Sequence, residues 1–213
     1  MKNLLCTAAM LAAITLPAQA QEINFKPYVG FDLQRTNIDY NDNYDIGGGL
    51  ALNGNTILED SLNGFNVHVG NRFHKNFGAE LGYFRTKEES KSIAAGSTVG
   101  PGTVAGADFT TDVKIQGITL DALGYLPLGA EKRFELIGTA GVSWMKGEVT
   151  ATVPGADSGD VDESEIGFRG GAGAQFNVTN QVNVRGLARY QSADFEDVAD
   201  KAWTYSLGLN YSF

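Results

Sequence analysis

The sequence predicts an all-β protein, an eight-stranded antiparallel up-and-down transmembrane β-barrel, and three observations lead to this prediction. Apolar residues recur at every second position along eight segments, whereas helical spacing never persists long enough to indicate a helix. The connections between the segments alternate between short and long. One face of each segment carries large apolar side chains, and the other face is rich in Gly, Ser, Asn and Thr.

The first four segments show the alternation most simply. We expect strands at about residues 23–35, 64–73, 77–84 and 113–126. In the first strand, for example, Phe31 and Asp32 belong to opposite faces, because successive side chains of a strand point to opposite sides. The fourth segment changes phase between Ile115 and Ile118, which predicts a β-bulge or kink near Gly117.

The last four segments continue the pattern. We expect strands at about residues 133–146, 166–176, 182–191 and 203–213. Ile137 is an exception, since it falls on the polar face of the fifth strand. The final segment runs from Trp203 to Phe213 with a large apolar residue at every second position. This last strand must pair with the first, because an open sheet edge cannot be left in hydrocarbon.

The lengths of the connections indicate the topology. Strands two and three join through "HKN", four and five through "PLGAEK", and six and seven through "NVTNQ". The other four connections, at about 36–63, 87–112, 147–164 and 192–201, are long and polar. Short turns at one end and long loops at the other are typical of outer-membrane barrels.

The sizes of the side chains indicate which face points outward. The interior of eight strands is narrow, so the small polar set fits inside and the large apolar set fits against lipid. Two aromatic girdles are expected: Phe73, Phe77, Phe134, Phe176 and Phe213 beside the short turns, and Tyr83, Trp144, Phe168, Tyr190 and Trp203 beside the long loops. A soluble, lipocalin-like barrel with the apolar face inside is the structural alternative.

The N-terminus predicts export. Residues 1–20, "MKNLLCTAAMLAAITLPAQA", combine Lys2, a short apolar core and a small-residue end, so we expect a signal peptide that is cleaved before Gln21. The single cysteine, Cys6, lies within this segment, so the mature domain, residues 21–213, is expected to use no disulfides. Without Lys2, 15 of the 16 basic residues remain, against 25 acidic ones. The resulting net charge of −10 argues against nucleic acid as a partner.

Several stretches together resemble the small outer-membrane barrels of the OmpA-like and OmpX/Ail-like group. They are "FKPYVGFD", "FGAELGYF", "LGYLPLG", "GGAGAQF" and "YSLGLNYSF", and the resemblance covers residues 21–213. It implies location in the Gram-negative outer membrane, and biogenesis through periplasmic chaperones and the barrel-assembly machinery. That machinery is expected to read an assembly signal formed by Tyr205, Leu207, Leu209, Tyr211 and Phe213. The sequence ends at the barrel, so we expect no OmpA-type peptidoglycan-binding domain.

Charged residues on the small-polar face predict a lumen ion-pair network. Its expected members are Lys26, Asp32, Arg72, Glu80, Asp121, Glu135, Arg169, Arg185 and Arg189. A narrow lumen must desolvate these charges, which favours cross-barrel pairs that plug it. The family resemblance implies that Glu80 pairs with a basic residue, Arg185 being the first choice and Arg189 the second. A small or gated, porin-like conductance is the alternative.

No stretch predicts catalysis, a cofactor or a metal site. His68 is expected to form hydrogen bonds inside the lumen and His74 to lie in a turn, and neither belongs to a nucleophilic motif. The acidic loop Asp157–Glu165 lacks the spacing of a calcium loop and is expected to be solvated. The sequence therefore favours a structural or surface-interaction role, with outer-membrane lipid and lipopolysaccharide as partners. An adhesin that binds a host or surface ligand through its long loops is the alternative.

Overall fold

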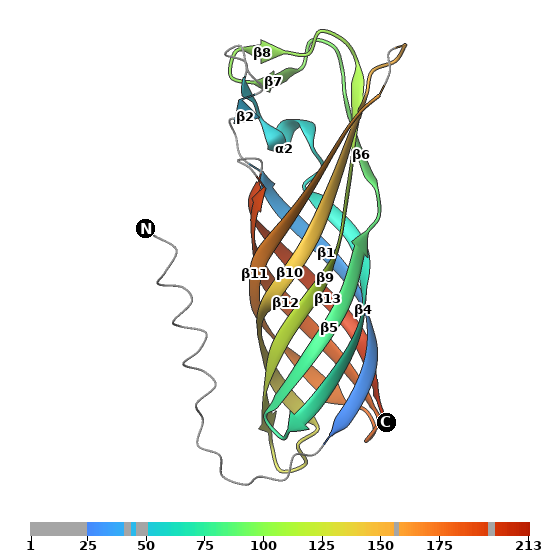
Figure 1. Ribbon diagram of the computed structural model, residues 1–213, viewed down its shortest axis with the longest axis vertical. Helices are drawn as coiled ribbons and strands as arrows, with labels where there is room; N and C mark the ends of the chain where they lie inside the picture. Colours follow the sequence, from blue (N-terminus) through green and yellow to red (C-terminus); the bar gives the residue numbers. More distant parts are fainter. Residues whose placement is uncertain (1–24, 41–43, 46–50, 156–157, 196–198) are drawn as a thin grey trace, which may run out of the picture.

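The computed structural model describes residues 25–40, 44–45, 51–155, 158–195 and 199–213, and Figure 1 shows them as a barrel of tilted strands. Eight long strands form the wall: β1 (Lys26–Tyr40), β4 (Ser61–His74), β5 (Phe77–Thr86), β9 (Phe109–Leu128), β10 (Phe134–Thr152), β11 (Gly159–Asn177), β12 (Val182–Phe195) and β13 (Ala199–Ser212). Neighbouring strands are antiparallel, and β1 pairs with β13 to close the ring. The predicted fold class is therefore confirmed. The expected signal peptide, residues 1–20, lies outside the described residues.

Helices contribute little to the described part of the chain. Its α-helix, α2 (Gly54–Ile57), is a single turn that begins after Asn53, whose side chain accepts a hydrogen bond from the Thr56 N–H. Among the described residues, no helix has the length and apolar character needed to span a membrane.

The seam between the first and last strands follows the predicted alternation. Val29 lies opposite Tyr211, and Phe31 lies opposite Leu209. Beyond the last rung, the N–H of Phe213 donates to the carbonyl of Pro27 at 3.0 Å. These hydrogen bonds satisfy backbone groups that an open edge would leave exposed to hydrocarbon.

The short connections lie together at one end of the barrel. Residues 75–76 join β4 to β5, residues 129–133 join β9 to β10, and residues 178–181 join β11 to β12. In the second turn, Gly129 has φ 74° and Lys132 has φ 52°, a region that glycine adopts more easily than lysine. Short turns are characteristic of the periplasmic end of an outer-membrane barrel, which fixes the orientation.

At the extracellular end, the structure corrects two predictions about the long connections. β10 and β11 pair without interruption as far as Ala151 and Gly159, so most of residues 147–164 is strand rather than loop. β9 pairs with β10 up to Thr110, and β6 (Glu89–Ile93) joins the edge of β9. Beyond the membrane both faces of a strand meet water. The polar–apolar alternation that identified the other strands is therefore not required there.

The predicted bulge near Gly117 is also absent from β9. The pairing of β9 with β10 is continuous from Thr110 to Leu128, and Gly117 lies opposite Met145. Ile115 and Thr119 both face the interior, so the alternation of the strand is not interrupted. The inward-facing residues change from apolar at Ile115 to polar at Thr119. The change in sequence pattern marks a boundary between apolar and polar layers inside the barrel.

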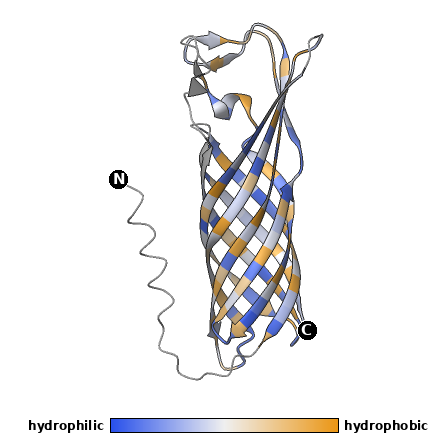
Figure 2. Ribbon diagram, viewed as in Figure 1, coloured by the Kyte–Doolittle hydropathy of each residue, from blue (hydrophilic) through white to orange (hydrophobic). Residues whose placement is uncertain are grey.

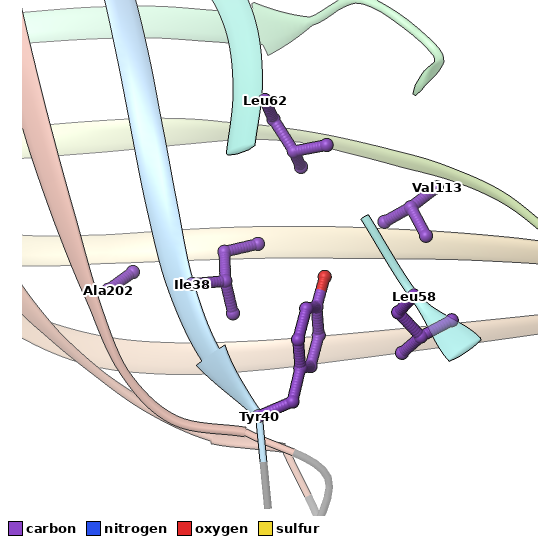
Figure 3. Close-up of a cluster of buried hydrophobic side chains, with 6 residues drawn as sticks. All are labelled: Ile38, Tyr40, Leu58, Leu62, Val113 and Ala202. Atoms are coloured by element: carbon purple, nitrogen blue, oxygen red, sulfur yellow. The ribbon is translucent and has the colours of Figure 1, made fainter. Parts of the chain in front are cut away.

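An apolar cap fills the extracellular mouth. Figure 3 shows its six buried side chains, Ile38, Tyr40, Leu58, Leu62, Val113 and Ala202. Leu58 follows α2, which crosses the mouth above the barrel wall (Figure 1). Lys91 holds this crossing segment by donating to the carbonyls of Asn55 and Leu58 at 2.8 and 3.0 Å. The Tyr40 hydroxyl donates to the Glu59 carbonyl at 3.2 Å.

The remaining short elements lie above this cap. They are β2 (Tyr44–Asp45), β3 (Ala51–Leu52), β7 (Thr98–Gly100) and β8 (Thr103–Val104), paired as β2–β3 and β7–β8. Ile93, Val99 and Ala105 form a second buried cluster there, with Leu52 and Ile57 packed against it. The first two long connections thus share a small apolar core outside the membrane.

The outer wall is apolar between two aromatic girdles. Figure 2 shows hydrophobic and hydrophilic residues alternating along the strands. Leu207 is 64% exposed and Leu120 is 55% exposed, whereas Thr119 and Asp121, the two neighbours of Leu120 in the chain, are each 2% exposed. Phe134 lies opposite Phe176 beside the short turns, and Tyr190 lies opposite Trp203 near the other end. The large apolar side chains therefore point outward, which contradicts the lipocalin-like alternative.

Candidate functional site: the barrel lumen and the extracellular sheet

Arg185 occupies the centre of the lumen and contacts two carboxylates from distant strands. Its guanidinium donates to Asp32 at 3.0 and 2.8 Å and to Glu80 at 2.6 and 3.1 Å. All three side chains are almost fully buried, at 0–2% exposure. Buried charges are tolerated only when they are paired and hydrogen-bonded, and this two-sided contact meets both conditions.

A glycine explains how these groups reach one another. Asp32 on β1 and Arg185 on β12 both lie opposite Gly208 of the intervening strand β13. A side chain at Gly208 would collide with the Asp32 carboxylate and with the carbonyl of Phe31. The missing side chain leaves the space in which the guanidinium and the carboxylate meet.

His68 extends this contact network. Its Nε2 lies 2.8 Å from the Asn210 amide oxygen, and its Nδ1 lies 3.3 Å from the Asn66 amide nitrogen. Its ring nitrogens also lie 3.6 Å from Asp32 and 3.7 Å from Glu80. Because the ring is enclosed on these sides and 3% exposed, it matches the predicted role of a lumen hydrogen-bonding histidine.

A second group of charges lies beside this centre. Arg169 approaches Asp121 at 3.0 Å, and Arg189 lies 3.8 Å from Glu80. Together with Arg185 and Asp32 these residues form what we call the ionic layer: Asp32, Glu80, Asp121, Arg169, Arg185 and Arg189. It contains three carboxylates and three guanidiniums. Arg169 and Arg189 also line a cavity of about 30 Å³ below the apolar cap, large enough for a water molecule.

Toward the periplasm, two tyrosines cover the ionic layer. The Tyr28 hydroxyl donates to Glu80 at 3.1 Å and lies 3.4 Å from the Tyr125 hydroxyl. Neither tyrosine was singled out from the sequence. The sequence signal that could have identified them is a large aromatic residue on an otherwise small-polar face. Tyr28 lies opposite Gly70, where a side chain would collide with the Tyr28 ring.

Arg72 and Glu135 form a separate pair below the tyrosines. The two guanidinium nitrogens of Arg72 each donate to a Glu135 oxygen at 2.9 Å, and the guanidinium lies over the Tyr125 ring at 4.2 Å. Gln175 donates to the same carboxylate at 2.5 Å. This contact joins β4, β10 and β11 near the short turns.

Lys26 is the one expected network member that the structure does not bring into an ion pair with any described residue. It is exposed at the periplasmic rim, and its cross-strand neighbour is Arg72, another cation. Membership of Lys26 in the network therefore stays a prediction. The register places it opposite a like charge and away from the carboxylates. The other eight predicted residues lie in the contacts described above.

The extracellular sheet is formed by β6 and by the parts of β9, β10 and β11 that extend beyond the membrane. Lys114 and Glu148 form an ion pair across β9 and β10, and Lys146 contacts Glu148 at 3.5 Å and Asp162 at 2.9 Å. The hydrogen bond from Lys114 lowers the pKa of Glu148. The acidic segment predicted as a loop is thus largely part of β11, where successive residues point to opposite faces. Among the described residues, no group of three candidate metal ligands occurs.

The residues of the expected assembly signal lie on the outer face of β13 and, in the case of Phe213, directly after its last residue. Tyr205, Leu207, Leu209, Tyr211 and Phe213 are 51%, 64%, 56%, 43% and 72% exposed. They lie on one face because the strand alternates without interruption along its pairing with β1 up to Lys201.

Comparisons with known proteins agree with this architecture. A family model described as "Outer membrane protein beta-barrel domain" matches residues 6–213. Ail of Yersinia pestis, solved with the heparin analogue sucrose octasulfate, has a TM-score of 0.55 at 17% identity, covering 89% of this chain and 99% of that one. Neisserial surface protein A has a TM-score of 0.55 at 17% identity, with coverages of 88% and 97%. OprG of Pseudomonas aeruginosa has a TM-score of 0.55 at 13% identity, with coverages of 88% and 95%. No curated protein sequence matches the chain.

Proposed function

The chain belongs to the outer membrane protein β-barrel domain family, and we propose that this integral outer-membrane protein is sealed to solutes and acts through its extracellular sheet. Two layers of different chemistry support the sealed lumen. The ionic layer fills the middle of the barrel around Arg185, which is 1% exposed. The apolar cap fills the extracellular mouth around Leu62, which is 0% exposed. A conducting pore would have to hydrate or displace both layers.

The free edge of β11 supports the surface-interaction role. β11 pairs with β12 only from Arg169 to Asn177, so among the described residues no strand pairs with its outer edge over residues 159–164. An unpaired edge offers backbone donors and acceptors to an added strand. β-strand addition is an established way of binding extended peptides.

The charge of this edge favours a basic partner. Asp162 and Glu163 lie on the extension of β11, and the whole chain carries a net charge of −9. Complementary charge assists association and excludes like-charged partners. Ail was solved with a heparin analogue, which is a polyanion; here the acidic edge favours an extended cationic peptide instead.

Replacing the β10–β11 extension tests the interaction role. A variant in which a short turn replaces residues 147–164 should keep its heat-modifiable migration on a gel and lose binding to immobilised cationic peptides. A matched variant that shortens residues 94–106 of the second connection should keep that binding. Equal binding by the wild type and the 147–164 variant would contradict the role of this edge.

Planar bilayer recording tests the seal. Purified wild-type protein is expected to give no steady conductance. A steady, large conductance would show that solutes pass the two layers and would favour the porin-like alternative. A Glu80→Ala change should destabilise the barrel or produce conductance, because it removes one of the two carboxylates that hold Arg185.

A non-enzymatic role is part of the same proposal. His68 lies within the sealed lumen between Asn66 and Asn210, away from any surface that a membrane substrate could reach. Lipid A of unchanged mass in cells that express the protein is the expected result, and a modified lipid A would contradict it.

Biogenesis and lipid partners complete the proposal. We propose cleavage of residues 1–20, folding by the barrel-assembly machinery with periplasmic chaperones, and contact of lipopolysaccharide phosphates with Arg35 and Arg85, which are both exposed.

Deletion of Phe213 should impair membrane insertion more than it lowers the stability of barrels already assembled. Insertion and unfolding are measured separately, and equal impairment of both would contradict an assembly signal.

A further inference from the structure

The periplasmic end of the barrel contains a cavity that the sealed-barrel function does not use. Its volume is about 840 Å³, and Tyr28 and Tyr125 lie among its lining residues. Small-molecule sites usually occupy about 300–1,000 Å³. Because the two tyrosine hydroxyls meet 3.4 Å apart beneath the ionic layer, the cavity ends there. We call this cavity the periplasmic vestibule.

The vestibule carries an excess of positive charge. Its charged lining residues are Lys26, Arg72, Lys75, Lys132 and Arg133 on the basic side, and Glu131 and Glu135 on the acidic side. Five basic against two acidic groups give a local charge of +3, whereas the whole chain carries −9. Arg72 and Glu135 neutralise each other through their two hydrogen bonds. The excess therefore resides in the lysines and Arg133.

The position of Lys26 indicates that an anion belongs there. Lys26 and Arg72 lie directly opposite each other on β1 and β4, and like charges at opposed positions destabilise a sheet. Glu135 compensates Arg72, but no described carboxylate forms an ion pair with Lys26, Lys75 or Lys132. A bound anion would compensate these lysines without disturbing the Arg72–Glu135 pair.

Amide groups on the wall indicate a ligand that also carries hydroxyls. The side-chain oxygen of Asn183 is buried at the wall and accepts no hydrogen bond from the described residues. Gln175 and Asn177 are held in place by hydrogen bonds to Glu135 and to the Lys132 carbonyl. The wall thus combines cationic donors with an acceptor for a ligand hydroxyl.

We propose that the vestibule binds a phosphorylated polyol from the periplasmic side. Phosphate oxygens match the lysine ammonium groups, and the polyol hydroxyls match the amide wall. This chemistry is shared by free sugar or glycerol phosphates and by the phosphatidylglycerol headgroup of the inner leaflet. The proposal does not depend on the extracellular role described above.

Calorimetric titration of the folded protein with glycerol 3-phosphate tests the site. In phosphatidylcholine nanodiscs, the wild type should bind this probe saturably, and the Lys26→Gln/Lys75→Gln variant should bind it about tenfold or more weakly, since each lost contact is a hydrogen bond to a charged group. Lys87→Gln, at an exposed extracellular position, is the matched control and should bind as the wild type does. Heat-modifiable migration confirms that each variant is folded.

Nanodiscs that contain phosphatidylglycerol distinguish the two possible ligands, the free phosphorylated polyol and the lipid headgroup. Weaker apparent binding of glycerol 3-phosphate in these discs identifies the lipid headgroup as a competing ligand, and unchanged binding identifies the free compound. Both outcomes require the site. If the double variant does not fold, Lys132→Gln replaces it, because Lys132 lies in a turn. No saturable binding by the wild type in phosphatidylcholine discs, or equal binding by the lysine variants, would overturn the proposal.

Discussion

The ionic layer and the apolar cap close the same barrel by opposite chemistry. Arg185 makes four hydrogen bonds to two carboxylates, so the ionic layer depends on a few directional contacts. The apolar cap contains six buried side chains from β1, β4, β9 and β13 and the segment after α2, and its packing is non-directional. The ionic layer should therefore fail when one partner is lost, whereas the cap should weaken in proportion to the apolar volume removed.

The largest effect is expected from Arg185→Met. The change leaves Asp32 and Glu80 buried without their main partner, and breaking a buried pair costs about 3–5 kcal/mol. Urea unfolding in detergent micelles measures the loss. Arg189→Met is the matched control, because the nearest carboxylate contact of Arg189 is 3.8 Å long, and its loss should be clearly smaller. Equal losses would show that the layer stabilises the barrel as a general cluster of charge.

Leu62→Ala should have the next largest effect and tests the cap. Leu62 is 0% exposed, so the change removes packed volume and should lower the free energy of unfolding by about 2–3 kcal/mol. Leu120→Ala, on the lipid-facing wall, is the control and should cost less. Bilayer recordings of Leu62→Ala should still show no steady conductance, because the ionic layer remains; an open pore would assign the seal to the cap alone.

Gly208→Ala should disturb the ionic layer without removing a charge. The added methyl group would meet the Asp32 carboxylate and the Phe31 carbonyl, and such overpacking costs about 1–3 kcal/mol. Gly138→Ala is the control, since nothing lies within 4 Å of the position its methyl group would take. Equal unfolding free energies for the two variants would argue against the close approach of Asp32 and Arg185 at this glycine.

The smallest effect is expected in the extracellular sheet. Lys114 lowers the pKa of Glu148, so its stabilisation is present above the ordinary carboxyl pKa and is lost as pH falls through the lowered value. Because this pair is accessible to solvent, only local protection of the β10–β11 extension should decrease. Hydrogen-exchange protection factors measure this, and Glu148→Gln should remove the pH dependence. An unchanged pH dependence in that variant would assign it to other carboxylates.

The barrel wall could be predicted from the sequence, because lipid imposes an alternation that single residues reveal. Phe31 against Asp32 identified both faces of β1, and eight of the nine predicted lumen charges lie in the contacts found. The apolar cap could not be predicted, because its members come from separate strands and from the segment after α2. Ile115 faces inward and packs against this cap, so an apolar residue on the inner face of β9 imitated a change of phase. The cross-strand neighbour of Lys26, Arg72, could not be predicted, because register is not visible in one strand.

The seam between β1 and β13 also has a consequence for the order of events in biogenesis. Val29 and its partner Tyr211 lie near opposite ends of the described part of the chain, so β1 has no final neighbour on that side until β13 is available to pair. Contacts between such distant residues form slowly, and a waiting edge can pair with other chains. The barrel therefore stays open until β13 pairs with β1. This pairing decides when the protein becomes resistant to aggregation.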